Sequence, residues 1–188
     1  MAIDFRAIEQ RFGELFGFIQ QDLSRIIQLE PGVNYAAAAL VACACETMAK
    51  YRNASGEGGD AFATLLPSGI YQTISKTIYN ALRNGLVHSY EAQDIEFNGS
   101  RVGLAIAWRE TSHLTLLFKE GKPHLVLNMR ELCERLSEQI DSFRAQLMAD
   151  ASARDRFFTQ CRKDRVQTAG TPQEVLAWKA LADGIAEA

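Results

Sequence analysis

A stripe of apolar residues at helical spacing runs through residues 5–27 and constrains the fold more than any other feature. Its members recur mostly three or four positions apart: Phe5, Ile8, Phe12, Leu15, Phe16, Ile19, Leu23, Ile26 and Ile27. This spacing predicts one long amphipathic helix, with Asp4 at its N-cap. Such a stripe must be buried, so other elements of the chain have to pack against it.

The next helix is predicted to be its hairpin partner. "YAAAALVACACETMAKY", residues 35–51, consists of strong helix formers and small side chains that let a neighbouring helix approach closely. "RNASGEGGD", residues 52–60, is polar and glycine-rich and predicts a loop. It lacks the Lys-Ser/Thr pair and the preceding buried strand of a phosphate-binding P-loop. A third long helix is expected from residue 69 to about residue 89.

The hydrophobic period changes between residues 93 and 129. "DIEF", "RVGLAIAW", "HLTLLFK" and "HLVLNM" are short runs of β-branched, aromatic and aliphatic residues, separated by "NGS", "RETS" and "EGKP". They predict a β-meander of three or four antiparallel strands. Helical spacing returns at Leu132, Leu136, Ile140, Phe143 and Leu147, and a final helix is expected from Thr171, with Pro172 at its first position.

The predicted architecture is mainly α, of the α+β class. We expect a single domain over residues 1–188, in which an antiparallel helical bundle carries an inserted β-meander. Residues 1–90 form the helical part that contains the motif described below. Residues 93–129 form the meander, and residues 130–188 form the C-terminal helices.

Charge and composition limit the classes of function. The formal net charge of −3 argues against a broad basic surface that coats nucleic acid. No apolar run reaches the length of a membrane span, and the N-terminal residues lack the pattern of a signal peptide, so we expect a soluble cytoplasmic protein with no membrane association. The four cysteines lack metal-binding spacing and are predicted to be reduced packing residues. We expect neither a metal nor a cofactor.

"ALRNGLVHSY", residues 81–90, lies on the third predicted helix. Lys76, Asn80, Asn84 and His88 follow one another at four-residue steps and form a polar stripe opposite the predicted core side, which holds Ile70, Ile74, Ile78, Ala81, Leu82 and Gly85. Arg83 lies on the polar half about 140° from His88, with Val87 between them. An exposed valine there suits a partner surface better than solvent.

The residues Arg83, Asn84 and His88 resemble the R-N-x-x-x-H signature of HEPN-superfamily domains. The order of the helices is similar too, with two long antiparallel helices followed by the motif near the end of a later helix. The resemblance covers residues 5–90 and leaves the β-meander unaccounted for. It implies a HEPN-like bundle and a metal-independent RNA endonuclease of the toxin or defence type. In that family two motifs meet across a two-fold dimer interface. An antitoxin or a nucleotidyltransferase is the partner that a toxin of this kind implies.

These residue types suit metal-free RNA cleavage. A histidine near its ordinary pKa of about 6.5 can accept or donate a proton at neutral pH, and an arginine offers a fixed cation for the phosphate. His88 and Arg83 are the expected catalytic residues, with Asn84 orienting the phosphate or the imidazole. A homodimer brings each Arg83 near the partner's His88. Lys76 and Asn80 would extend the site along a bound RNA strand.

Two other interpretations remain open. A non-catalytic HEPN-like module would serve dimerisation or the binding of a protein or nucleotide, and the acidic charge favours it. Alternatively, the motif is accidental and the polar face is simply solvated. Among other polar residues, Glu46 and Lys50 are expected to form a surface pair, and His113 and His124 lack carboxylate partners for a metal. Trp108 and Trp178 are expected to be packing residues.

Overall fold

The computed structural model describes residues 5–29, 33–53, 57–89, 92–108, 112–163 and 171–186; at 53, 87–89 and 180–186 only the backbone is described. The helices are α1 (Phe5–Gln28), α2 (Asn34–Met48), the π-helix η1 (Ala49–Asn53), α3 (Gly58–Ala63), α4 (Ile70–Thr73), α5 (Ser75–Ser89), α6 (Met129–Ala149), α7 (Ala151–Lys163) and α8 (Pro172–Ala186). The strands are β1 (Ile95–Phe97), β2 (Ser100–Ala107), β3 (Leu116–Lys119) and β4 (Lys122–Asn128).

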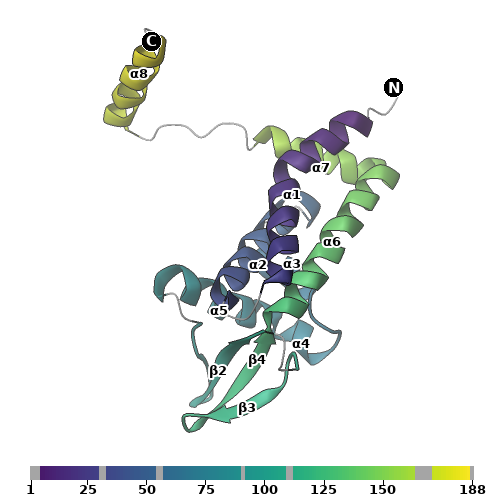
Figure 1. The fold of residues 1–188 in the computed structure, drawn as a ribbon, viewed down its shortest axis with the longest axis vertical. Helices are drawn as coiled ribbons and strands as arrows, with labels where there is room; N and C mark the ends of the chain where they lie inside the picture. The colour runs from purple at the N-terminus through teal and green to yellow at the C-terminus, as the bar shows by residue number, and fades with distance from the viewer. Residues whose placement is uncertain are drawn as a thin grey trace.

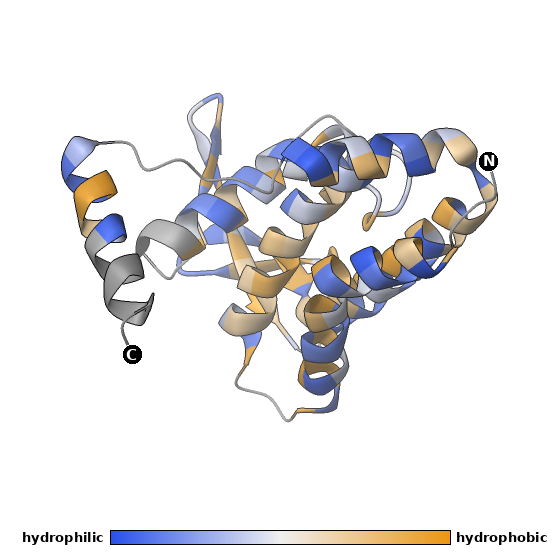
Figure 2. Cartoon of the chain, turned by 90° about the horizontal axis from the view of Figure 1, so that it is seen from above, coloured by the Kyte–Doolittle hydropathy of each residue, from blue (hydrophilic) through white to orange (hydrophobic). Residues whose placement is uncertain are grey.

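The prediction of a mainly helical chain with a small inserted sheet is confirmed. Helices α1 and α6 lie side by side, with the sheet at one end of α6 and α7 at the other (Figure 1). Apolar residues gather where the helices face one another (Figure 2). An aromatic cluster joins α1, α6 and α7: the rings of Phe12 and Phe16 stack with centroids 4.8 Å apart, and Phe143 and Phe157 meet edge to face at 5.9 Å. Burial of these rings holds α1 against α6 and α7.

The prediction of an antiparallel meander is wrong in its topology. The four strands form a mixed sheet in the order β1-β2-β4-β3, and β2 runs parallel to β4, with Leu104 opposite Leu125. Only β1–β2 and β3–β4 are antiparallel hairpins. After β2, the chain therefore crosses to the far edge of the sheet and forms β3 there. It then returns as β4, which lies between β2 and β3.

Turn chemistry explains this topology. The two hairpins turn at Asn98-Gly99 and Glu120-Gly121, whose residues all have positive φ between 48° and 77°. These backbone angles favour a tight two-residue turn, and glycine adopts them without steric cost. The "RETS" sequence between β2 and β3 contains no glycine. The segment that follows it is bound to β4 by backbone hydrogen bonds instead. Leu114 is buried and donates its N–H to the Val126 carbonyl oxygen at 2.8 Å, on the side of β4 away from β2.

Two helix boundaries also differ from those predicted. The expected loop at residues 52–60 holds the end of η1 and the start of α3 at Gly58, and its residues 54–56 lie outside the described ranges. The expected helix from residue 69 is interrupted at Ile74, between α4 and α5. Because of this interruption, Ile70 and Ile74 are 70% and 38% exposed instead of lying in the core.

The buried face of α6 and the start of α8 agree with the sequence prediction. The predicted core residues of α6, from Leu132 to Leu147, are buried. α8 starts with Pro172 at its first position, and Thr171 and Glu174 form a capping box. Trp108 is buried as expected, but Trp178 on α8 is 66% exposed. Of the four cysteines, which are all free, Cys43 is exposed and the other three are buried.

His113 lies at the junction of the sheet and α6 and makes the stability of the folded protein depend on pH. Its Nδ1 accepts the N–H of Asn128 at 3.1 Å, so this nitrogen must be unprotonated. Burial lowers the pKa of His113 below its ordinary value of 6.5, and the nearby guanidinium of Arg135 adds to this, while Glu131 opposes it. The unfolded chain therefore binds this proton more readily than the folded protein, and the stabilisation is complete above pH 6.5 and lost below it.

We predict that His113→Gln, which retains an acceptor, weakens the fall in unfolding free energy between about pH 7.5 and about pH 5. Urea unfolding of both proteins at the two pH values measures this difference. An equal fall in the wild type and the variant would contradict the assignment.

Candidate functional site

Helix α5 presents the polar stripe beside α2 and α3. Its buried side holds Ile78, Leu82 and Leu86. On the opposite side Lys76 and Asn80 are exposed and Asn84 is half-buried, so the predicted stripe is confirmed for these three residues. His88 belongs to the same helix one turn after Asn84, but its side chain and that of Val87 lie outside the described part of the structure.

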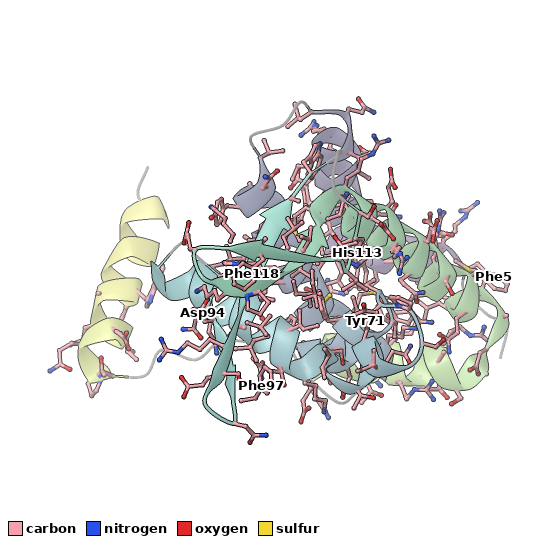
Figure 3. All side chains as sticks on the ribbon, turned by 90° about the horizontal axis from the view of Figure 1, so that it is seen from below. Phe5, Tyr71, Asp94, Phe97, His113 and Phe118 are labelled. Carbon is pink, nitrogen blue, oxygen red and sulfur yellow. The ribbon has the colours of Figure 1, made fainter. Side chains whose placement is uncertain are left out.

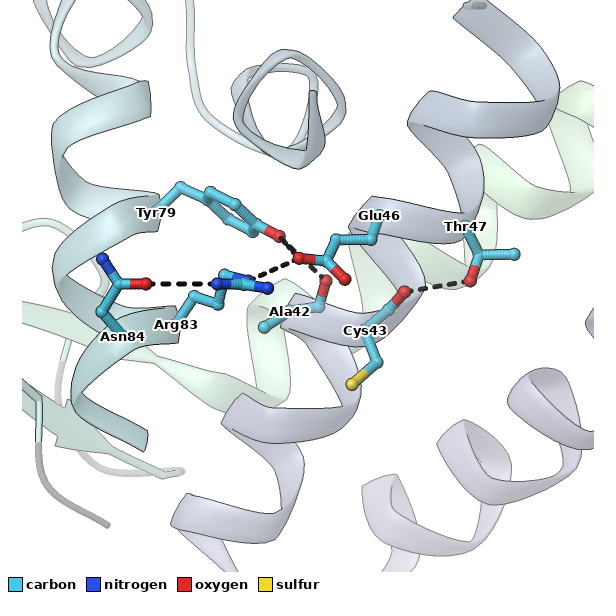
Figure 4. A network of polar contacts seen from close by, with 7 residues as sticks. All are labelled: Ala42, Cys43, Glu46, Thr47, Tyr79, Arg83 and Asn84. Carbon is cyan, nitrogen blue, oxygen red and sulfur yellow. Dashed lines mark hydrogen bonds and ion pairs between the residues drawn. The ribbon is translucent and has the colours of Figure 1, made fainter. Parts of the chain in front are cut away.

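Arg83 is held by a carboxylate from α2. Its Nε donates to Oε1 of Glu46 at 2.5 Å, and its Nη1 donates to Oδ1 of Asn84 at 3.2 Å (Figure 4). The two ion-paired side chains are 41% and 45% exposed, so solvent screens the pair. The hydrogen bond from Arg83 to Glu46 and the carboxylate charge raise the pKa of Arg83 further. The guanidinium is therefore a permanent cation in a defined orientation.

Tyr79 contacts the same carboxylate, that of Glu46, from within the core. Its hydroxyl lies 3.2 Å from Oε1 of Glu46 and 3.3 Å from the Ala42 carbonyl oxygen, and the residue is 3% exposed. Burial, followed by the charge of Glu46, raises the pKa of Tyr79. The phenol thus stays protonated and serves as a hydrogen-bond donor to Glu46 or to the α2 backbone.

Lys76 is paired with the segment that begins α3. Its Nζ lies 2.6 Å from Oε2 of Glu57 and 3.0 Å from Oδ1 of Asp60. Hydrogen bonds to these two carboxylates raise the pKa of Lys76, which remains charged. The first turn of α3 lies close to α5 because residues 58 and 59 are glycines, and side chains there would collide with Tyr79 and Lys76.

These groups surround one polar cavity of about 280 Å³. Its lining comes from α2, from the start of α3 and from α5: Glu46, Glu57, Gly58, Gly59, Lys76, Tyr79, Asn80 and Arg83. With Asp60 included, two cations face three carboxylates, which gives one net negative charge. Two of the five N–H groups of Arg83 are used in the contacts above, so its fork retains donors for an oxyanion.

The structure brings together three of the residues that the sequence singled out, Lys76, Asn80 and Arg83. Asn84 contacts Arg83 and lies beside the cavity, outside its lining. Sequence analysis missed Tyr79 and Gly58 and interpreted Glu46 as a surface partner of Lys50. The spacing of Tyr79 and Arg83, four residues apart on one helix, was the available signal for a shared partner.

The described ranges can be compared with the requirements of a metal site and of a membrane-spanning helix. They contain no cluster of three or more His, Cys, Asp or Glu side chains able to hold a metal ion. Nor do they include a helix with both the length and the apolar character that crossing a bilayer requires.

Compared with models of protein families, with curated proteins and with solved structures, the chain matches none. The resemblance to HEPN domains therefore depends on the motif residues and the order of the helices.

We predict that Gly58→Ala destabilises the protein by about 1–3 kcal/mol. An added Cβ would lie 2.2 Å from the Tyr79 hydroxyl oxygen and 3.0 Å from Cγ of Glu46, so the buried Tyr79 side chain would have to shift and lose its contacts to α2. Urea unfolding measures the change. The matched control is Gly13→Ala in α1, where nothing lies within 4 Å and helix propensity favours alanine. Equal stability of Gly58→Ala and wild type would refute this tight contact.

Proposed function

We propose that the protein is a HEPN-like, metal-independent RNA endonuclease that acts as a homodimer. The observation that carries the proposal is the arrangement around Arg83. The arginine of the R-N-x-x-x-H motif is oriented by Glu46 and Asn84 at the edge of a polar cavity, and Lys76 and Asn80 follow on the same face. A guanidinium held in one orientation loses less entropy when it binds a phosphate.

In the proposed reaction the 2′-oxygen of a ribose attacks the adjacent phosphorus and the bond from phosphorus to the 5′-oxygen breaks. His88 accepts the proton of the 2′-hydroxyl while water protonates the departing 5′-oxygen, or His88 protonates the 5′-oxygen while water takes the proton of the 2′-hydroxyl. Arg83 stabilises the charge that develops on the phosphorane. The products are RNA ends with a 2′,3′-cyclic phosphate and a 5′-hydroxyl. Glu46 and Tyr79 are positioning residues, because they act on the substrate only through Arg83.

The geometry of α5 supports the proposed dimer. His88 comes five positions after Arg83, so their Cα–Cβ directions differ by about 140° around the helix. In addition, the Arg83 side chain is engaged with Glu46 on α2 of its own chain. An isologous contact through this face would supply His88 from one protomer and Arg83 from its partner. Val87 would then be buried at the contact.

We predict that the purified protein cuts RNA in the presence of a chelator and that His88→Ala and Arg83→Ala each slow cutting by at least about 100-fold. Denaturing gels of total tRNA and messenger RNA provide the readout, and end-labelling identifies the cyclic phosphate.

Arg101→Ala is the matched control for Arg83→Ala. It also removes an exposed arginine from an ion pair with a glutamate, but on the β1–β2 hairpin, and it should leave cutting unchanged. Cutting that survives His88→Ala at the wild-type rate would refute the proposed reaction.

A non-catalytic dimerisation or binding module is the second candidate. The net negative charge around the cavity favours it, since each of the two cations already has a carboxylate partner. This alternative predicts a stable dimer that leaves RNA intact with or without Mg²⁺. It also predicts that Glu46→Gln, which removes one carboxylate, strengthens the binding of a labelled RNA without starting cleavage.

A further inference from the structure

An apolar groove lies at the sheet end of the molecule, away from the polar cavity. It encloses about 690 Å³ between the helical segment Ile70–Ile78 and the sheet, where Ile95, Val102 and Leu116 line it. Ile70 and Leu116 are 70% and 67% exposed. Figure 3 shows Tyr71 and Phe97, which also line the groove, from the sheet end of the molecule. An apolar opening of this size on a soluble chain marks a binding surface.

Helix α8 exposes large apolar side chains in the part whose side chains the structure describes, residues 172–179. Val175, Leu176 and Trp178 are 52%, 67% and 66% exposed, and the helix stands apart from the bundle (Figure 1). Its capping box and proline start define a 15-residue helix. An isolated helix of this length is marginal in water, so its stability depends on burying the apolar side chains elsewhere.

We propose that α8 of a second copy of this chain occupies the groove. An amphipathic helix that fills an apolar groove with aromatic and aliphatic side chains is a common mode of recognition. Lys179 follows Trp178 on α8 and offers a partner for Glu96, the one charged residue in the described groove lining, while Glu174 of α8 is engaged in the capping box. This exchange of α8 between two copies of the chain does not depend on RNA cleavage.

Because of the position of α7, the α8 that fills the groove is expected to come from a second copy and not from the same chain. α7 ends beside the first half of α1, where Cys161 and Arg162 share a cavity with Ala7 and Arg11. The 21-residue α6, roughly 31 Å long, separates this end of the bundle from the sheet. The chain from Lys163 to Thr171 takes eight residue steps and spans at most about 29 Å. A protomer in the opposite orientation brings its α8 directly to this groove, and a two-fold axis repeats the contact.

Photo-crosslinking tests the exchange in the full-length protein. Benzoylphenylalanine replaces the exposed Thr77 in the groove of one copy, which is mixed with an isotopically labelled copy that lacks the probe. We expect a covalent dimer in which the probe is attached to a labelled peptide from residues 171–186. Trp178→Glu in the labelled copy should lower the yield about tenfold or more, because it removes an aromatic anchor.

Phe18→Glu is the matched control, since Phe18 is a similarly exposed aromatic residue on α1, and it should leave the yield unchanged. Circular dichroism verifies that both variants are folded. The proposal would be overturned if the probe attached to α8 of its own chain or only to other segments. It would also be overturned by the absence of a crosslink, or by a crosslink yield that Trp178→Glu does not change.

Discussion

The close packing of α5 against α2 is the contact on which the candidate site depends. Buried alanines along α2, including Ala38 and Ala42, leave room for α5 to approach. As a result the Tyr79 hydroxyl comes within 3.3 Å of an α2 backbone carbonyl, and Arg83 reaches Glu46. Larger side chains on α2 would separate the helices and break both contacts. The polar cavity is therefore a consequence of the small residues in the core.

The charges around the cavity set how it can act. Glu46 fixes the orientation of Arg83 but also competes with a phosphate for the same guanidinium. The pair is nearly half exposed, so it is worth only about 1 kcal/mol or less, and a phosphate with good geometry can share the guanidinium without a large cost. Lys76 is more heavily neutralised, because two carboxylates face it. Arg83 is consequently the cation most available to a ligand.

Sequence periodicity predicted the helices and strands because burial of one face imposes a regular spacing. It could not give the strand order, which depends on the parallel pairing of β2 with β4 and on the burial of Leu114. It also missed the interruption at Ile74, because Ile70 and Ile74 fit the helical pattern while lining a groove. Glu46 joined the site through a contact 37 residues away in sequence, which no local pattern reveals.

The central claim is that two chains complete one site, with Arg83 from one protomer and His88 from its partner. Co-expression of Arg83→Ala and His88→Ala chains with different affinity tags allows the mixed dimer to be isolated. Of its two composite sites one retains both residues and the other has neither, so the account predicts about half of the wild-type cleavage rate in chelator. A mixed dimer as inactive as either variant alone, beside an active wild type, would contradict the account.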